Sequence, residues 1–239
     1  MDQSRSAGGT TRPPVSKHVV LVHGVWMPGA VMAWLKRQLA HDHGFRGHLF
    51  SYASIRGTLD ENAELLADFI RALGIDNVHL VGHSLGGVVS LRMLALNDDA
   101  PPGRLVCLGS PLGGCRVAST LTRHSWGNSV LGRALVAGVL DEAATEWAAR
   151  VTDYREIGII AGTRSMGVGR LVTTFDEDCD GTVTVSETRL PGARDHLCLP
   201  VSHMGMTMSR AVADQTAAFL ERGEFLRATR RPILRRPVS

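Results

Sequence analysis

The chain has 239 residues, of which 44% are hydrophobic and 21% are charged, so it lacks the low hydrophobicity and high net charge of disordered proteins. No apolar run reaches the roughly 18 residues of a membrane-spanning helix, and the first residues lack the apolar segment of a secretory signal, so we expect a cytoplasmic protein without a membrane span. Of the net charge of +3, the tail of residues 222–239 holds +5, which leaves −2 for the body and argues against nucleic-acid binding there.

The first predicted elements alternate strands with helices. Residues 1–16 are rich in Ser, Gly, Thr and Pro and are predicted to form a disordered leader. The β-branched run 18–24 ends at a glycine and predicts a buried strand. Residues 30–43 then carry apolar side chains at helical spacing, and residues 47–54 predict a second strand.

A capping box marks the next helix. Thr58 followed by Glu61 is the N-terminal signature, and Gly74 closes the helix. Its apolar stripe consists of Leu65, Leu66, Phe69, Ile70 and Leu73. A third strand is predicted at 77–82 and an apolar helix at 85–96.

Three further strands and a closing helix complete the pattern. The strands are predicted at 104–109, 156–162 and 196–201, and the helix at 205–221. Strands that are apolar throughout and alternate with helices predict an α/β fold, with about six mostly parallel strands covered by helices on both faces. We expect a single domain over residues 17–221.

Residues 113–150 form a long helix-rich excursion between two predicted strands. In the simpler interpretation, its apolar face packs on the domain. In the alternative, the excursion is a cap whose apolar face borders a substrate pocket. The face is made of Val130, Leu131, Leu135, Val136, Val139 and Leu140.

The pentapeptide Gly82-His83-Ser84-Leu85-Gly86 has the G-x-S-x-G pattern of a serine nucleophile. It directly follows a predicted strand and opens an apolar helix, which is the context that this motif requires. The tight turn exposes the Ser84 hydroxyl, and the backbone N–H of Leu85 then offers half of an oxyanion hole. The alternative is a Gly-Ser turn that only connects two elements.

At this point the sequence resembles bacterial lipases and esterases of the α/β-hydrolase superfamily, most closely the small lipases with a minimal sheet. The resemblance runs from about Val19 to Leu220 and rests on VLVHGVW at 20–26, on GHSLG at 82–86, and on DGTV at 180–183 with SHMG at 202–205. It implies a minimal α/β-hydrolase fold with six parallel strands. It also implies that Val25, the residue after His-Gly, supplies the second oxyanion N–H beside that of Leu85.

A serine nucleophile needs a base, and the fold order is serine, acid, histidine. Of ten histidines, only His196 and His203 lie near the last predicted strand. His203 follows the strand, in the loop at its C-terminal end, where catalytic residues of open α/β sheets gather. His196 begins the strand at the opposite edge, so His203 is the predicted base.

The acid is expected after the fifth strand, in the run 175–181. Asp180 is favoured because its D-G-x-V pattern matches the family and because the glycine after it permits a sharp turn. Asp178, Asp176 and Asp195 are the alternatives.

The same acidic run also fits a second interpretation, a calcium-binding loop. Asp176, Asp178, Asp180, Gly181 and Glu187 fit the pattern of a calcium-binding EF-hand loop. An EF-hand requires flanking helices, whereas the preceding residues hold two glycines and the following ones alternate like a strand. We therefore expect no required cofactor, with calcium as the weaker alternative.

Together these features predict a serine ester hydrolase, a lipase or carboxylesterase, that cleaves a small-molecule acyl ester through an acyl-enzyme. The catalytic residues are Ser84, Asp180 and His203, with Val25 and Leu85 as the oxyanion hole. Trp26 and the series Met204, Met206 and Met208 favour an apolar acyl site, although methionines so spaced are more often core residues. The alternatives are an acyl thioesterase with the same residues and a non-catalytic scaffold that binds a hydrophobic ligand or partner.

The basic tail and the cysteines are the last features of the sequence. The basic tail allows transient contact with an anionic lipid surface but is more often solvated. The four cysteines, Cys107, Cys115, Cys179 and Cys198, contain no CxxC pair, so we expect thiols and neither a zinc site nor a redox motif.

Overall fold

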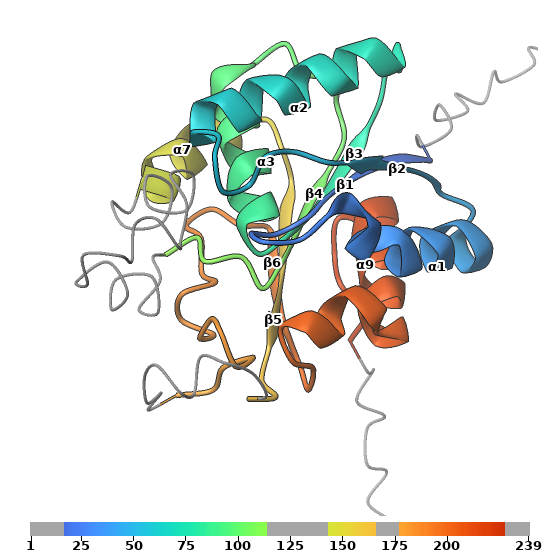
Figure 1. The fold of residues 1–239 in the computed structure, drawn as a ribbon. Helices are drawn as coiled ribbons and strands as arrows, with labels where there is room; N and C mark the ends of the chain where they lie inside the picture. Colours follow the sequence, from blue (N-terminus) through green and yellow to red (C-terminus); the bar gives the residue numbers. More distant parts are fainter. Residues whose placement is uncertain (1–16, 114–142, 166–176, 228–239) are drawn as a thin grey trace, which may run out of the picture.

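The computed structural model describes residues 17–113, 143–165 and 177–227 (Figure 1). Six strands form one sheet in the order β2-β1-β3-β4-β5-β6, and every neighbouring pair is parallel. The strands are β1 (His18–Val22), β2 (Arg46–Phe50), β3 (His79–His83), β4 (Leu105–Leu108), β5 (Ile157–Gly162) and β6 (Asp195–Leu199). The predicted α/β fold class with six parallel strands is therefore confirmed.

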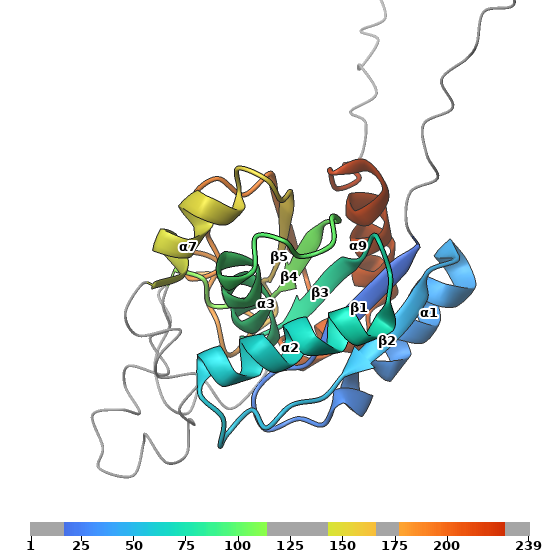
Figure 2. The same cartoon turned by 90° about the horizontal axis from the view of Figure 1, so that it is seen from above.

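Helices cover both faces of this sheet (Figures 1 and 2). Helices α2 (Leu59–Leu73), α3 (Leu85–Leu96) and α7 (Ala143–Val151) contribute to one hydrophobic cluster. Helices α1 (Ala33–His43) and α9 (Arg210–Arg222) contribute to the other, on the opposite face.

Both faces of the central strands are buried, which explains their uninterrupted apolar runs. In β1, Val20 and Val22 belong to the first cluster and Val19 and Leu21 to the second. Side chains alternate across a strand, so a strand between two helical layers needs apolar residues at consecutive positions.

Local sequence signals set the ends of several elements. The predicted capping box is present: Glu61 N–H donates to the Thr58 hydroxyl, and Thr58 N–H donates to the Glu61 carboxylate. The predicted helix at 205–221 is in fact two elements, a 3₁₀ helix η2 (Met204–Met208) and α9, because the Ser209 side chain caps α9 by accepting from Val212 N–H.

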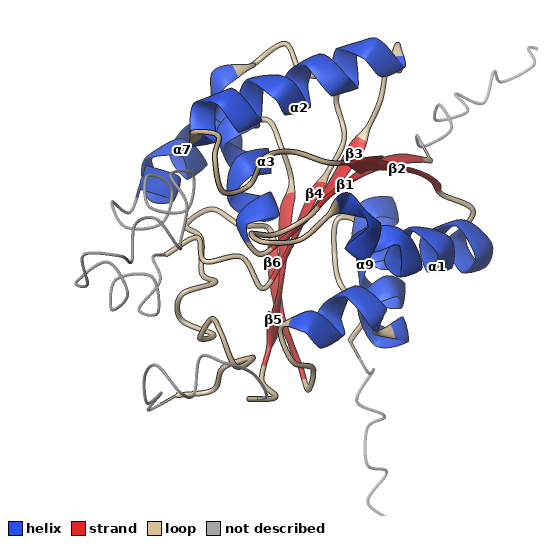
Figure 3. Ribbon diagram, viewed as in Figure 1, coloured by secondary structure: helices blue, strands red, loops and turns tan. Residues whose placement is uncertain are grey.

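The second strand is shorter than predicted. It ends at Phe50, and residues 51–58 form a loop before α2 (Figure 3). Of the predicted excursion 113–150, the structure describes Gly113 and residues 143–150. Ala144 and Ala148 of α7 pack into the first cluster, as does Val151 just after the excursion. The two interpretations of the apolar face at 130–140 stay predictions.

Several other predictions fall outside the described residues. They concern the leader 1–16, most of the excursion with its apolar face, Cys115, and the tail beyond Arg227. The other three cysteines are free thiols. None of the helices in the described ranges is both long and apolar enough to cross a membrane.

Candidate active site

The proposed nucleophile lies in a strained turn at the C-terminal end of β3. Ser84 connects β3 directly to α3, with φ 54° and ψ −125°, and its N–H donates to the carbonyl of Leu108. Such a backbone conformation costs a non-glycine residue on the order of 1–3 kcal/mol and persists only where the surrounding structure imposes it. Ser84 is 6% exposed, so it lies almost buried at the sheet edge.

The two glycines of the motif make this turn possible. A Cβ atom at Gly82 would lie 2.4 Å from the backbone of Gly87, and one at Gly86 would lie 2.2 Å from the Val22 carbonyl oxygen. Both distances are far below van der Waals contact. Glycine is therefore required at both positions because α3 approaches β3 and β1 too closely for a side chain.

The structure brings the predicted base and acid together. The Nδ1–H of His203 donates to Oδ2 of Asp180 across 2.7 Å, and the backbone N–H of His203 donates to the Asp180 carbonyl across 2.9 Å. Asp180 is fully buried and His203 is 7% exposed. Because Nδ1 carries the proton in this hydrogen bond, Nε2 of the neutral ring is an acceptor.

Asp180 is itself fixed by its own turn. Its Oδ1 accepts from the backbone N–H groups of Thr182 at 2.9 Å and Val183 at 2.8 Å. Both carboxylate oxygens are thus engaged by the protein, and one of them is committed to His203. This arrangement holds the acid in a single orientation.

The predicted base lies against the end of β3, the strand that Ser84 directly follows. The ring of His83, the last residue of β3, is 4.8 Å from the ring of His203, centroid to centroid. Its Nε2–H donates to the backbone carbonyl of His203 across 2.9 Å. Ser84 and His203 therefore belong to the same edge of the sheet, although 119 positions separate them.

The loop after β1 passes beside the nucleophile. A Cβ atom at Gly24 would lie 2.9 Å from the Cβ of Ser84, which brings the half-buried Val25 to the same edge. Leu85 is the first residue of α3, and the first N–H groups of a helix have no acceptor within it. The two predicted oxyanion donors thus flank the turn of Ser84.

Tyr52, which no sequence motif singles out, supports this loop. Tyr52 donates its hydroxyl to the His23 carbonyl at 2.9 Å, and its N–H donates to Nε2 of His23 at 3.3 Å. The His23 ring stacks on the Tyr52 ring, and its Nδ1–H donates to the Gly24 carbonyl. Burial lowers the pKa of His23, which favours the neutral ring that these two bonds require.

An open groove adjoins the loop after β1. Its volume is about 430 Å³, and Trp26 at 53% exposure and Ile55 at 40% are its large exposed apolar residues. The remaining lining residues are Met27, Tyr52, Ala53, Ser54 and Arg56. Of the methionine series, Met206 is buried in the core, whereas Met204 and Met208 are exposed.

The alternative acids and base have other partners. Asp195 accepts two hydrogen bonds from the Arg227 guanidinium, and Nε2 of His196 contacts the Thr188 hydroxyl. Asp178 is exposed. Asp176 lies outside the described residues.

The acidic run does not have the surroundings of an EF-hand. After Glu187 the chain forms turns and then β6, where an EF-hand needs a helix. Glu187 accepts from the N–H of Thr184, and Asp180 is bound to His203. In the described part of the chain, no group of three or more His, Cys, Asp or Glu side chains is arranged to hold a metal ion.

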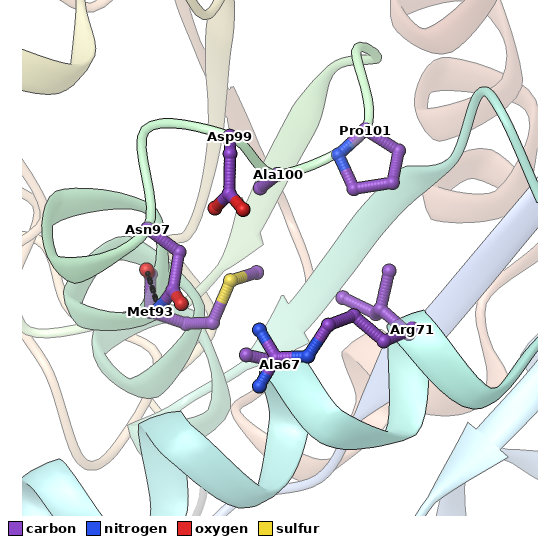
Figure 4. A pocket seen from close by; sticks show the side chains of 8 residues that line it. Ala67, Arg71, Met93, Asn97, Asp99, Ala100 and Pro101 are labelled. Atoms are coloured by element: carbon purple, nitrogen blue, oxygen red, sulfur yellow. Dashed lines mark hydrogen bonds between the residues drawn. The ribbon is translucent and has the colours of Figure 1, made fainter.

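A second pocket lies far from this edge. Figure 4 shows it between α2 and the C-terminal end of α3, lined by Met93, Asn97 and Pro101 among others. Its volume is about 30 Å³, which holds a water molecule and no larger ligand. Ser84 stands at the other end of α3, about 18 Å away along a helix of 12 residues.

Comparisons with known proteins agree with this architecture. The model of the alpha/beta hydrolase family matches residues 19–233. A search of the curated proteins finds no match.

Three solved structures illustrate the likeness. The lipase BlEst2 of Bacillus licheniformis, in its mature form, superposes with a TM-score of 0.69 at 18% identity, over 89% of this chain and 94% of that one. The lin2722 gene product of Listeria innocua gives 0.60 at 17%, over 87% and 94%. The metagenomic carboxyl esterase MGS0156 gives 0.59 at 17%, over 84% and 70%. At these identities the similarity shows the fold alone.

Proposed function

This chain belongs to the alpha/beta hydrolase family, and from that membership and the buried Asp180–His203 pair at the edge that carries Ser84 we propose that it is a serine ester hydrolase. The hydrogen bond from His203 Nδ1 to Asp180 Oδ2 is the single observation that carries the proposal. It leaves Nε2 as the proton acceptor that a serine nucleophile needs. Structural similarity to a lipase and a carboxyl esterase supports the same class.

In the proposed reaction, Ser84 Oγ attacks the carbonyl carbon of the ester while His203 Nε2 takes its proton. Asp180 keeps the imidazole in the right tautomer and stabilises the imidazolium that forms. The imidazolium then protonates the departing alcohol, which leaves an acyl-enzyme. A water molecule activated by the same imidazole hydrolyses the acyl-enzyme and regenerates Ser84.

The backbone N–H groups of Val25 and Leu85 hold the negative oxygen of the tetrahedral intermediate. Each donor lowers the barrier by about 3 kcal/mol. The hydrogen bonds of Tyr52 and His23 support this role, because they fix the loop that carries Val25. The mechanism uses protein groups and the water that is consumed, so it requires no cofactor.

The substrate is an ester with an apolar part that fits beside Trp26. The groove of about 430 Å³ adjoins the oxyanion loop and presents Trp26 and Ile55 to solvent. An acyl or alcohol chain bound there removes apolar surface from water. Rates that do not differ between acetyl and long-chain esters would remove the case for this groove.

The experiment that tests the proposal is hydrolysis of a panel of aryl esters, with fluorophosphonate labelling in parallel. We expect wild type to turn over and to be labelled, and Ser84→Ala to do neither. Ser90→Ala is the matched control, since Ser90 is a buried serine of α3, the helix that follows Ser84, and its hydroxyl donates to the Gly86 carbonyl. Labelling that survives in Ser84→Ala refutes the proposal, and absence of labelling in all three proteins favours a non-catalytic scaffold.

The same panel separates esters from thioesters. A thioester and an ester of the same acyl group share the acyl-enzyme, so they share the second half of the reaction. Hydrolysis of the thioester with a markedly higher kcat/KM would assign the protein as a thioesterase. His203→Ala is expected to lose activity on both.

A further inference from the structure

The histidine that precedes the nucleophile is fully buried and contacts the proposed base. His83 has 0% exposure, and its ring lies 4.8 Å from the ring of His203 at an interplanar angle of 48°. Its Nε2 is 2.9 Å from the backbone carbonyl oxygen of His203. The reaction proposed above gives this side chain no part.

The partners of His83 define its protonation state. A carbonyl oxygen only accepts, so Nε2 of His83 must carry the hydrogen, and Nδ1 of the neutral ring carries none. Among the residues that the structure describes, nothing hydrogen-bonds to Nδ1. Burial and the neighbouring His203 lower the pKa of His83 to about 3. The ring is therefore neutral throughout the pH range in which a histidine base works.

Outside its own 3₁₀ helix, three hydrogen bonds to His203 are found in the described part of the chain, and Asp180 and His83 supply them. The N–H of His203 donates to the Asp180 carbonyl and its Nδ1–H to the Asp180 carboxylate. Its carbonyl oxygen accepts from His83. The Asp180 contacts come from the segment between β5 and β6, whereas the His83 contact comes from β3, the strand that Ser84 directly follows.

On the basis of the proposed hydrolase activity, we propose that His83 is a positioning residue that ties the loop of His203 to the turn of Ser84. A rigid imidazole one residue before the nucleophile fixes how far the base stands from the hydroxyl that it must deprotonate. Without it, the hydrogen bonds that remain come from Asp180, which lies between β5 and β6, and Met206 holds the loop by apolar packing alone. Misplacement of reacting groups by about 1 Å costs on the order of 100-fold in rate.

The test compares replacements that keep or remove the donor. His83→Gln places an amide N–H near the position of Nε2, whereas His83→Leu fills a similar volume without a donor. We expect His83→Leu to lower kcat for a soluble short-chain ester about 10- to 100-fold with KM nearly unchanged. His83→Gln should stay within about fivefold of wild type.

A third replacement, with a polar side chain that is too short, helps to distinguish a missing donor from a loss of folding. His83→Asn is as polar as His83→Gln, but its amide is one methylene too short to reach the His203 carbonyl, so it should behave like His83→Leu in kcat. The control is His79→Leu, which removes a buried histidine from the start of the same strand and its bond to the Arg104 N–H. Its kcat should equal that of wild type, and thermal unfolding is measured for all variants.

The outcomes separate this role from the proposed function itself. Normal turnover by Ser84→Ala would refute the hydrolase mechanism. With that variant inactive, equal kcat in His83→Gln and His83→Asn overturns the positioning role alone, as does wild-type kcat in His83→Leu. A selective loss in the variants without a reaching donor, with Ser84 still labelled by fluorophosphonate, supports it.

Discussion

Replacing Asp180 by asparagine separates the proposed catalytic role of this carboxylate from its structural role. Oδ1 accepts from the N–H groups of Thr182 and Val183, and Oδ2 accepts from His203. In the variant, the amide oxygen must keep the position of Oδ1, because the reverse orientation would point the NH₂ group at two N–H donors. The NH₂ group then faces Nδ1 of His203.

The expected consequence is a change of tautomer in His203. Facing a donor, Nδ1 becomes an acceptor, so the ring proton moves to Nε2 and the ring no longer accepts the proton of Ser84. A loss of this kind costs on the order of 10⁴ in kcat. Stability should change little, because both hydrogen bonds of the turn remain.

The assay measures kcat/KM with a short-chain ester and the midpoint of thermal unfolding. Asp180→Ala provides the contrast, since it removes the acceptor of the half-buried Thr182 N–H, of the buried Val183 N–H and of the His203 ring. An unpaired buried donor costs about 1–3 kcal/mol. Asp180→Ala should lose both activity and several degrees of Tm, whereas Asp180→Asn loses activity alone.

The neighbouring carboxylate supplies the control. Asp178 lies two residues away and is exposed, so Asp178→Asn should match wild type in both measurements. Retention of more than about a tenth of the activity by Asp180→Asn would refute the reasoning. An equal loss in Asp178→Asn would transfer the role to the other residue.

Three further predictions concern pH, strain and the oxyanion loop. The folded-state pKa of His83 is about 3, below its ordinary value of 6.5, so the unfolded chain binds a proton that the folded protein excludes. The free energy of unfolding then falls as the pH drops from 6.5 toward 3, by up to about 1.4 kcal/mol per pH unit. His83→Gln should therefore lose less Tm than wild type between about pH 7 and pH 4.5. Equal losses of Tm would contradict this. Ser84 has a positive φ, which glycine adopts without the strain that alanine would carry. Ser84→Gly should therefore unfold a few degrees above Ser84→Ala in calorimetry. Identical midpoints would show that the turn stores no strain. Tyr52→Phe removes the hydroxyl that donates to the His23 carbonyl, so kcat should fall about tenfold at unchanged KM; a change below twofold would show that the loop holds without it.

Much of the fold was predictable because its signals are local. The apolar runs of the central strands reflect burial on both faces, and the box of Thr58 and Glu61 marks the start of α2 where the structure has it. The end of β2 was not predictable in this way, because residues 51–54 contain no glycine or proline to mark it, while Tyr52 leaves the strand to contact His23. That contact depends on a residue 29 positions away.

Local signals also mark part of the candidate site in the sequence. Ser84, Asp180 and His203 each lie in a short pattern whose chemistry can be interpreted locally, and the structure joins two of them directly by a hydrogen bond. The EF-hand pattern around Asp180 is equally local, yet such a pattern does not reveal that one oxygen of this carboxylate contacts an imidazole 23 residues further on. His83 gave no signal at all, because its partner is 120 residues away.

Glycines at the strand ends connect the sequence pattern to the site. A Cβ atom at Gly109, just after β4, would lie 2.9 Å from Oδ2 of Asp180, and one at Gly162, the last residue of β5, would lie 2.6 Å from the Asp180 Cβ. Gly24, after β1, clears the same kind of space beside Ser84. One strand thus ends in a glycine and two are followed by one within two residues, all at the edge where Ser84 and the buried Asp180 lie. In a parallel sheet the C-terminal ends of all strands share one edge, so glycines that close successive apolar runs indicate where a site forms before any catalytic motif is considered.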